Sequence, residues 1–288
     1  MIYDVFLAPF AEYTFMKRAL AACVALALGG GPVGVLLVLR RMSLMGDALA
    51  HSVLPGAAIG FMIGGLSLPA LALGGVAAGL AVALLAGMAS RATGLMEDAT
   101  LAGFFLVALA AGVLIVSLAG NSVDLTHVLF GNVLAVDAPS LLLVAGIASV
   151  TLAAMALSWR PLIAESFDPE FMELVGGGGR WHMLFLVLVV LNLVAGFQAL
   201  GTLMALGLMV LPAVAARLWA RNVWRMVVAA VGIALASGYG GLLISWHAGV
   251  PSGPAIVLAA GAAYGVSLFA GPQGGVLRRR QTVHHRHG

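Results

Sequence analysis

Residues 44–66 read LMGDALAHSVLPGAAIGFMIGGL, a long apolar run in which Asp47 and His51 stand four residues apart. A helix of about 20 apolar residues is long enough to cross the hydrocarbon core of a bilayer. A carboxylate inside such a segment is costly, so it normally faces a polar cavity and marks an ion or proton pathway. This run therefore predicts a membrane-spanning helix with an ion path along one face.

The rest of the chain repeats this pattern of long apolar runs. Of its 288 residues, 62% are hydrophobic and only 9% are charged, a balance that a soluble domain cannot bury. Barrel strands are shorter and alternate with polar residues, unlike these runs. We therefore predict an all-α, polytopic transmembrane helical bundle. Its spans are expected near 15–39, 44–66, 69–89, 99–119, 139–158, 182–199, 202–218, 226–246 and 254–271.

The number of spans is nine if every run crosses the membrane, and eight if one is re-entrant or split. Pro55 and Pro212 each interrupt one run, and proline removes a helical hydrogen bond. We assign residues 15–272 to one transmembrane domain, preceded by an N-terminal segment, 1–14, that can lie at the membrane interface. Residues 273–288 form a basic, histidine-rich tail, which we expect to be disordered and held near anionic lipid.

The basic residues predict the orientation of the chain. With nine spans and the N-terminus outside, 12 of the 14 lysines and arginines face the cytoplasm, and only Lys17 and Arg18 lie outside. Short cytoplasmic loops carry such an excess of positive charge. No basic stripe with interleaved aromatic residues is present, so we expect no nucleic-acid partner.

Asp47 and His51 are candidate metal ligands. On a helix, their spacing places both side chains on one face, about 6 Å apart along the axis. One carboxylate oxygen and one imidazole nitrogen suit first-row divalent cations. Ser43 extends this polar stripe by one turn, and Pro55 leaves the carbonyl of His51 without its helical N–H partner. A proton relay uses the same residue types, so that interpretation stays open.

Two longer loops carry further candidate residues. Asp124 and His127 in the outer loop 120–137, together with His247 near the outer end of the eighth span, are candidates for a cation entry funnel. The cytoplasmic loop 160–180 is acidic. It either docks a soluble partner or forms a solvated connector, and its acidic residues are Glu165, Asp168, Glu170 and Glu173.

Energy for transport must come from outside this chain. A phosphate-binding P-loop places a lysine after two spaced glycines, and the only lysine, Lys17, lacks them. Transport therefore needs an ion gradient or a separate ATPase subunit. The His-Glu-x-x-His zinc motif is absent, as is a Gly-x-Ser-Gly nucleophile turn, so we do not expect an enzyme. The single cysteine, Cys23, permits no intrachain disulfide, and we expect no tightly bound cofactor.

The stretch 40–56, RRMSLMGDALAHSVLPG, resembles the signature of the permeases in zinc/manganese ABC importers. Further matches to that family are short motifs spread over residues 10–270. They are Glu97-Asp98-Ala99, Leu129-Phe130-Gly131, Phe167-Asp168-Pro169-Glu170-Phe171, Gly201-Thr202-Leu203, Leu211-Pro212-Ala213 and Pro251-Ser252-Gly253.

The resemblance implies a multi-pass transport subunit of the bacterial cytoplasmic (inner) membrane that moves zinc or manganese, or else iron. It implies three protein partners: an ATP-binding cassette ATPase that binds ATP, an extracytoplasmic metal-binding protein, and a second permease copy. Asp47 and His51 of both copies would then line a central path. It also implies that loop 160–180, including Pro169, couples to the ATPase. The alternative is a proton-coupled secondary metal transporter that uses the same Asp/His pair.

Overall fold

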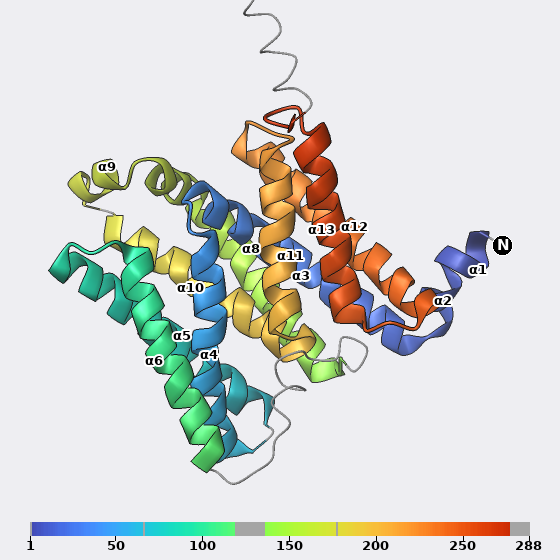
Figure 1. Ribbon diagram of the computed structural model, residues 1–288, viewed down its shortest axis with the longest axis horizontal. Coiled ribbons are helices and arrows are strands. Elements are labelled where there is room, and N and C mark those ends of the chain that lie inside the picture. Colours follow the sequence, from blue (N-terminus) through green and yellow to red (C-terminus); the bar gives the residue numbers. More distant parts are fainter. Residues whose placement is uncertain (1, 66, 119–135, 177, 277–288) are drawn as a thin grey trace, which may run out of the picture.

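The computed structural model describes residues 2–65, 67–118, 136–176 and 178–276, and every element in these ranges is helical. Figure 1 shows their arrangement. The predicted all-α class is therefore confirmed. The helices are α1 (Ile2–Phe6), α2 (Ala8–Glu12), α3 (Thr14–Leu39), α4 (Ser43–Gly64), α5 (Leu68–Thr93), α6 (Glu97–Leu118), α8 (Ala138–Phe167), α9 (Pro169–Leu174), α10 (Gly178–Leu200), α11 (Thr202–Arg217), α12 (Val223–Ala248) and α13 (Ser252–Ala270).

Eight of the described helices are long and apolar enough to cross a membrane. The predicted span 202–218 corresponds to α11, which has only 16 residues and contains the buried Pro212. Sixteen residues of helix reach about 24 Å, somewhat less than the hydrocarbon core of a bilayer. The sequence left open whether the chain has eight or nine spans. Among the described helices, the two counts differ only in whether the short helix α11 is included.

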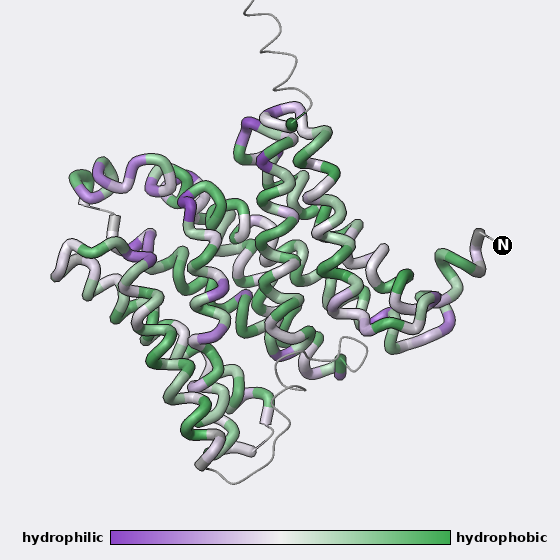
Figure 2. The backbone as a smooth tube through the Cα atoms, in the orientation of Figure 1, coloured by the Kyte–Doolittle hydropathy of each residue, from purple (hydrophilic) through white to green (hydrophobic). Residues whose placement is uncertain are grey.

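The long helices form two groups joined by a central layer. Helices α4, α5 and α6 pack together on one side, and α11, α12 and α13 pack on the other, with α3, α8 and α10 between them (Figure 1). Most of α3 and α10 is buried, whereas α6 exposes most of its apolar surface. Figure 2 shows hydrophobic residues along the long helices and hydrophilic ones gathered on α9 and at links between helices. This distribution suits a bundle whose outer face contacts lipid.

Helix α4 is held close to α5 by a stripe of small residues. A methyl group added at Gly56 would overlap the carbonyl oxygen of Gly74, and one added at Gly60 would overlap the carbonyl oxygen of Ala70. One at Gly64 would meet the side chain of Ala70 at 2.6 Å. The four-residue spacing of these glycines thus lets two backbones approach closely, as small residues do in membrane proteins.

Helix α8 continues past the end of the predicted fifth span. It bends at Ser158, whose φ of −112° is not helical, and then runs on to Phe167. Pro161 explains the bend, because it has no N–H to donate to the carbonyl one turn earlier. The segment 160–180, expected as a partly helical loop, therefore consists of the last turns of α8, the short helix α9 and the start of α10.

Candidate metal site and buried polar network

Asp47 and His51 lie on one open face of α4. The Oδ1 atom of Asp47 is 3.6 Å from Nε2 of His51, and the two side chains are 56% and 35% exposed. Two ligand atoms that each lie about 2.0–2.2 Å from one cation are separated by about 3.0–3.6 Å. The pair therefore fits two ligands of a single metal ion, as the helical spacing predicts.

The surroundings of the His51 ring are apolar. Phe105 of α6 stacks beside it, with ring centroids 6.3 Å apart. The Nδ1 atom of His51 is buried and has no hydrogen-bond partner within the described ranges. Metal-bound histidines usually donate from their second nitrogen to a carboxylate, carbonyl or water. Ser43 is the first residue of α4, and no described contact joins it to Asp47 or His51.

The described residues of one chain supply too few ligands for a closed metal site. No group of three or more His, Cys, Asp or Glu side chains suited to a metal is found among the described residues. Divalent transition metals take four to six ligands in proteins. The Asp47–His51 pair is therefore open to ligands from water or from another protein surface.

Of the candidate entry residues, His247 is described, and no described contact joins it to Asp47 or His51. Asp124 and His127 lie outside the described residues. His247 stands in the last turn of α12, where its Nε2 atom lies 3.0 Å from the carbonyl oxygen of Val5 in α1. Nearby, the hydroxyl of Tyr239 donates to the carbonyl of Phe6. The observed contact of His247 thus attaches the N-terminal segment to α12.

The acidic residues predicted for ATPase coupling occupy two different environments. Asp168 caps α9 by accepting a hydrogen bond from the N–H of Phe171 at 2.9 Å, and Pro169 occupies the first turn of that helix. Glu170 and Glu173 are exposed, whereas Glu165 is buried. Asp168 and Pro169 are residues that favour a helix start, so they shape the segment.

Large apolar side chains on the same segment are exposed. Leu174 is 87% exposed, and Phe167, Phe171 and Val175 also lie mostly open, while Met172 packs inward. A cluster of large exposed apolar residues between charged ones is typical of a surface that binds a partner. The name α9 surface refers to residues 167–175, which combine these apolar side chains with the acidic Asp168, Glu170 and Glu173.

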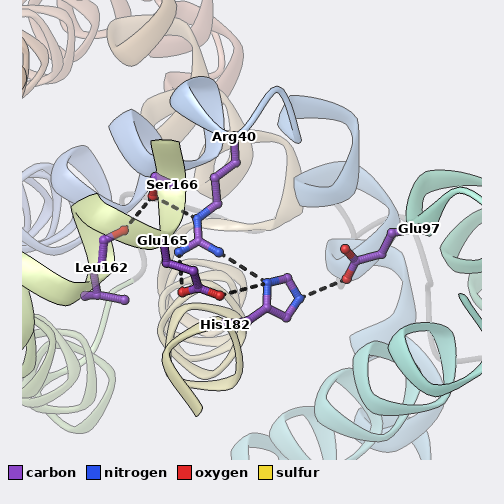
Figure 3. Close-up of polar contacts among 6 residues, drawn as sticks. All are labelled: Arg40, Glu97, Leu162, Glu165, Ser166 and His182. Carbon is purple, nitrogen blue, oxygen red and sulfur yellow. Dashed lines mark hydrogen bonds and ion pairs between the residues drawn. The ribbon is translucent and has the colours of Figure 1, made fainter. Parts of the chain in front are cut away.

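Arg40 is the centre of a buried polar network at the end of the bundle that carries α9 (Figure 3). One guanidinium nitrogen lies 3.0 Å from Oε2 of Glu165, a second donates to Oγ of Ser166 at 3.0 Å, and a third lies 3.2 Å from Nδ1 of His182. Nε2 of His182 is 2.9 Å from Oε1 of Glu97. The side chains of Arg40 and Glu165 are only 6% and 4% exposed.

Burial and pairing act in opposite directions on Arg40. Desolvation lowers the pKa of its guanidinium, and the carboxylate of Glu165 opposes that shift. The ring of Phe185 lies 4.1 Å from the guanidinium carbon and adds a cation–π contact. From the sequence, Arg40 counts among the basic residues that set the orientation and begins the 40–56 motif, but its contacts with Glu165, Ser166 and His182 were not predicted. One signal for this network was present in the sequence. Arg40 directly follows the apolar run 15–39, and a second apolar run, 44–66, begins a few residues later.

Comparisons with known proteins agree with the fold and place the chain in a transport family. The chain matches the ABC 3 transport family over residues 12–271. It is 32% identical to the manganese import system permease protein ScaB of Streptococcus parasanguinis, covering 91% of this chain and 92% of the relative. It is 34% identical to the manganese transport system membrane protein MntC of Halalkalibacterium halodurans, covering 93% and 91%.

A solved structure extends the likeness to three dimensions. The structure of PsaBC from Streptococcus pneumoniae in complex with Fab superposes with a TM-score of 0.84 at 29% identity, covering 97% of this chain and all of that one. Nearly the whole fold is therefore shared with that structure, and the family match spans most of the sequence. A transmembrane helical bundle with these matches is a transport subunit rather than an enzyme, and the chain belongs to the ABC 3 transport family.

Proposed function

We propose that this chain is the membrane permease of an ABC importer that carries a divalent transition metal, with manganese as the preferred ion, into the cytoplasm. The observation that carries the proposal is the Asp47–His51 pair, whose 3.6 Å separation fits one cation on an open face of a membrane helix. Relatives at 32% and 34% identity are named for manganese import and transport. Zinc accepts the same ligand types, so metal choice needs measurement.

Two copies of the chain would complete the metal site. Each copy offers one carboxylate and one imidazole from an exposed face, and two copies related by a two-fold axis would present four ligands. Such a site would hold the ion transiently. Its two carboxylates would balance the charge of the divalent cation during passage. A second permease copy is therefore proposed as a partner, with the bacterial cytoplasmic membrane as the location.

The α9 surface is proposed to dock the ATP-binding subunit. Its exposed Phe171 and Leu174 offer apolar contact area, and the exposed Glu170 and Glu173 offer negative charge for basic residues. The opposite ends of the spans would receive an extracytoplasmic metal-binding protein. On this arrangement, ATP binding in the partner subunits drives alternating access, and this chain contributes the path.

The test is metal uptake by proteoliposomes that hold the permease together with its ATP-binding subunit. We expect ATP-dependent uptake of Mn²⁺ that exceeds uptake of Zn²⁺ and Fe²⁺. Asp47→Asn and His51→Ala should each lower uptake by about tenfold or more, because each removes a metal ligand. The matched control is Asp98→Asn, which removes an exposed carboxylate at the start of α6 and should leave uptake unchanged.

Two outcomes would overturn this proposal. Equal uptake by wild type and the Asp47 and His51 variants would remove the site assignment. Uptake that follows an imposed proton gradient and continues without ATP would instead identify a secondary transporter that uses the same pair.

A further inference from the structure

We propose that Arg40 transmits movement of the α9 surface to α4, the helix that carries Asp47 and His51. This inference rests on the proposed function, since it needs an ATP-binding subunit at the α9 surface and a metal at α4. Arg40 is a positioning residue in this scheme, because it touches neither the metal nor the nucleotide. Three sets of contacts support it.

The first set joins Arg40 to the base of the α9 surface. Glu165 and Ser166 stand in the last turn of α8, directly before Phe167 and the α9 cap Asp168. Arg40 binds both, at 3.0 Å each. The hydroxyl of Ser166 in turn donates to the carbonyl of Leu162 at 2.6 Å, within α8. A guanidinium that forks to two adjacent residues fixes both position and orientation, which a single contact does not.

The second set joins Arg40 to α4. Only Arg41 and Met42 separate Arg40 from the first residue of α4, and Arg41 has a φ of 60°. That conformation is rare for a residue other than glycine. The N–H of Met42 bonds to the carbonyl of Leu37 at 2.9 Å, so the link is tight. A displacement of Arg40 therefore passes into the start of α4 and is not absorbed by slack chain.

The third set reaches α4 through α6. Arg40 donates to Nδ1 of His182, so we assign the ring proton to Nε2, which faces Oε1 of Glu97 in the first turn of α6. Helix α6 packs directly on α4. The closeness of the two helices is shown at Gly112 of α6, where an added methyl group would lie 3.0 Å from the backbone of Pro55 in α4. His182 thus extends the network to a second helix that contacts the metal-binding helix.

The polar network around Arg40 also borders a pocket, so its side chains have space in which to shift. A cavity of about 220 Å³ is lined by Glu97, Glu165 and His182 on one side and by Pro169 and Glu173 of α9 on the other. This pocket is half-open rather than a closed void, and Glu173, which lines it, is exposed. The α9 helix therefore meets the network across a gap, and its shift toward that gap would press on the group that Arg40 holds.

The experiment measures coupling in proteoliposomes that hold the permease with its ATP-binding subunit, using radiolabelled Mn²⁺. The variants are Arg40→Lys, which keeps the charge but loses the fork, and Glu165→Gln, which keeps the shape but loses the charge. Arg41→Lys is the matched control, because it makes the same change at the neighbouring, exposed residue. ATP hydrolysis, uptake and Mn²⁺ binding are measured on each complex.

We expect Arg40→Lys and Glu165→Gln to raise the ATP hydrolysed per ion transported by about tenfold, a usual size for coupling between sites. Hydrolysis and Mn²⁺ binding should stay near wild type, and Arg41→Lys should keep the wild-type ratio. An unchanged ratio in both variants would overturn the proposal. So would a parallel fall of hydrolysis and uptake with loss of the complex, which indicates a purely structural role. Absence of uptake by wild type would instead refute the proposed function.

Discussion

Replacement of Gly56 by alanine tests whether the close approach of α4 and α5 supports the metal site. The added methyl would overlap the carbonyl oxygen of Gly74 and lie 2.6 Å from the side chain of Ala78. Overpacking of this kind costs about 1–3 kcal/mol. Alanine in a helix gains back about 0.5–1 kcal/mol over glycine. The net effect should be a destabilisation of up to about 2.5 kcal/mol.

The matched control is Gly103→Ala on α6. Nothing lies within 4 Å of the methyl added there, so the substitution keeps only the helical gain and should stabilise by about 0.5–1 kcal/mol. The assay is thermal or denaturant unfolding of both variants in the same detergent. Because Gly56 shares α4 with Asp47 and His51, Gly56→Ala should also weaken Mn²⁺ binding. Equal stability of the two alanine variants would refute the reasoning about close packing.

Three further predictions concern the polar groups. Arg40→Met strands the buried Glu165 carboxylate and should destabilise by about 3–5 kcal/mol, whereas the double variant with Glu165→Met should recover most of that loss, as a double-mutant cycle of unfolding will show. Asp168→Ala removes the cap of α9 and should cost about 1 kcal/mol locally, seen as faster amide exchange in α9 with the long helices unaffected. Hydrogen bonds from Ser140 lower the pKa of Asp137, the cap of α8. That contribution to stability is therefore complete above the unfolded pKa and is lost as pH falls through the lower folded pKa. Asp137→Asn should remove this acid dependence, and an unaltered pH profile would contradict the assignment.

The sequence by itself determined the class of the fold and the placement of Asp47 and His51, the candidate metal ligands, on one helix face. Apolar runs of about 20 residues can only become helices in a bilayer, where every backbone polar group needs an internal partner. The four-residue spacing of Asp47 and His51 then decides that both lie on one face, as the 3.6 Å separation confirms. The spacing of Gly56 and Gly60 likewise predicts a close helix contact. All of these features depend on local periodicity, which the order of residues contains directly.

Tertiary structure decided which charges meet. Glu165 belongs by sequence to an acidic connector, yet it is buried against Arg40, which lies 125 positions earlier. His182 joins the same group from α10, and Glu97 joins it from α6. The bend at Ser158 aims the end of α8 toward Arg40 and sets Glu165 apart from the exposed Glu170 and Glu173. Periodicity assigns each side chain to a face of its own helix. The partner opposite that face depends on how separate helices pack, and this packing is a property of the whole chain.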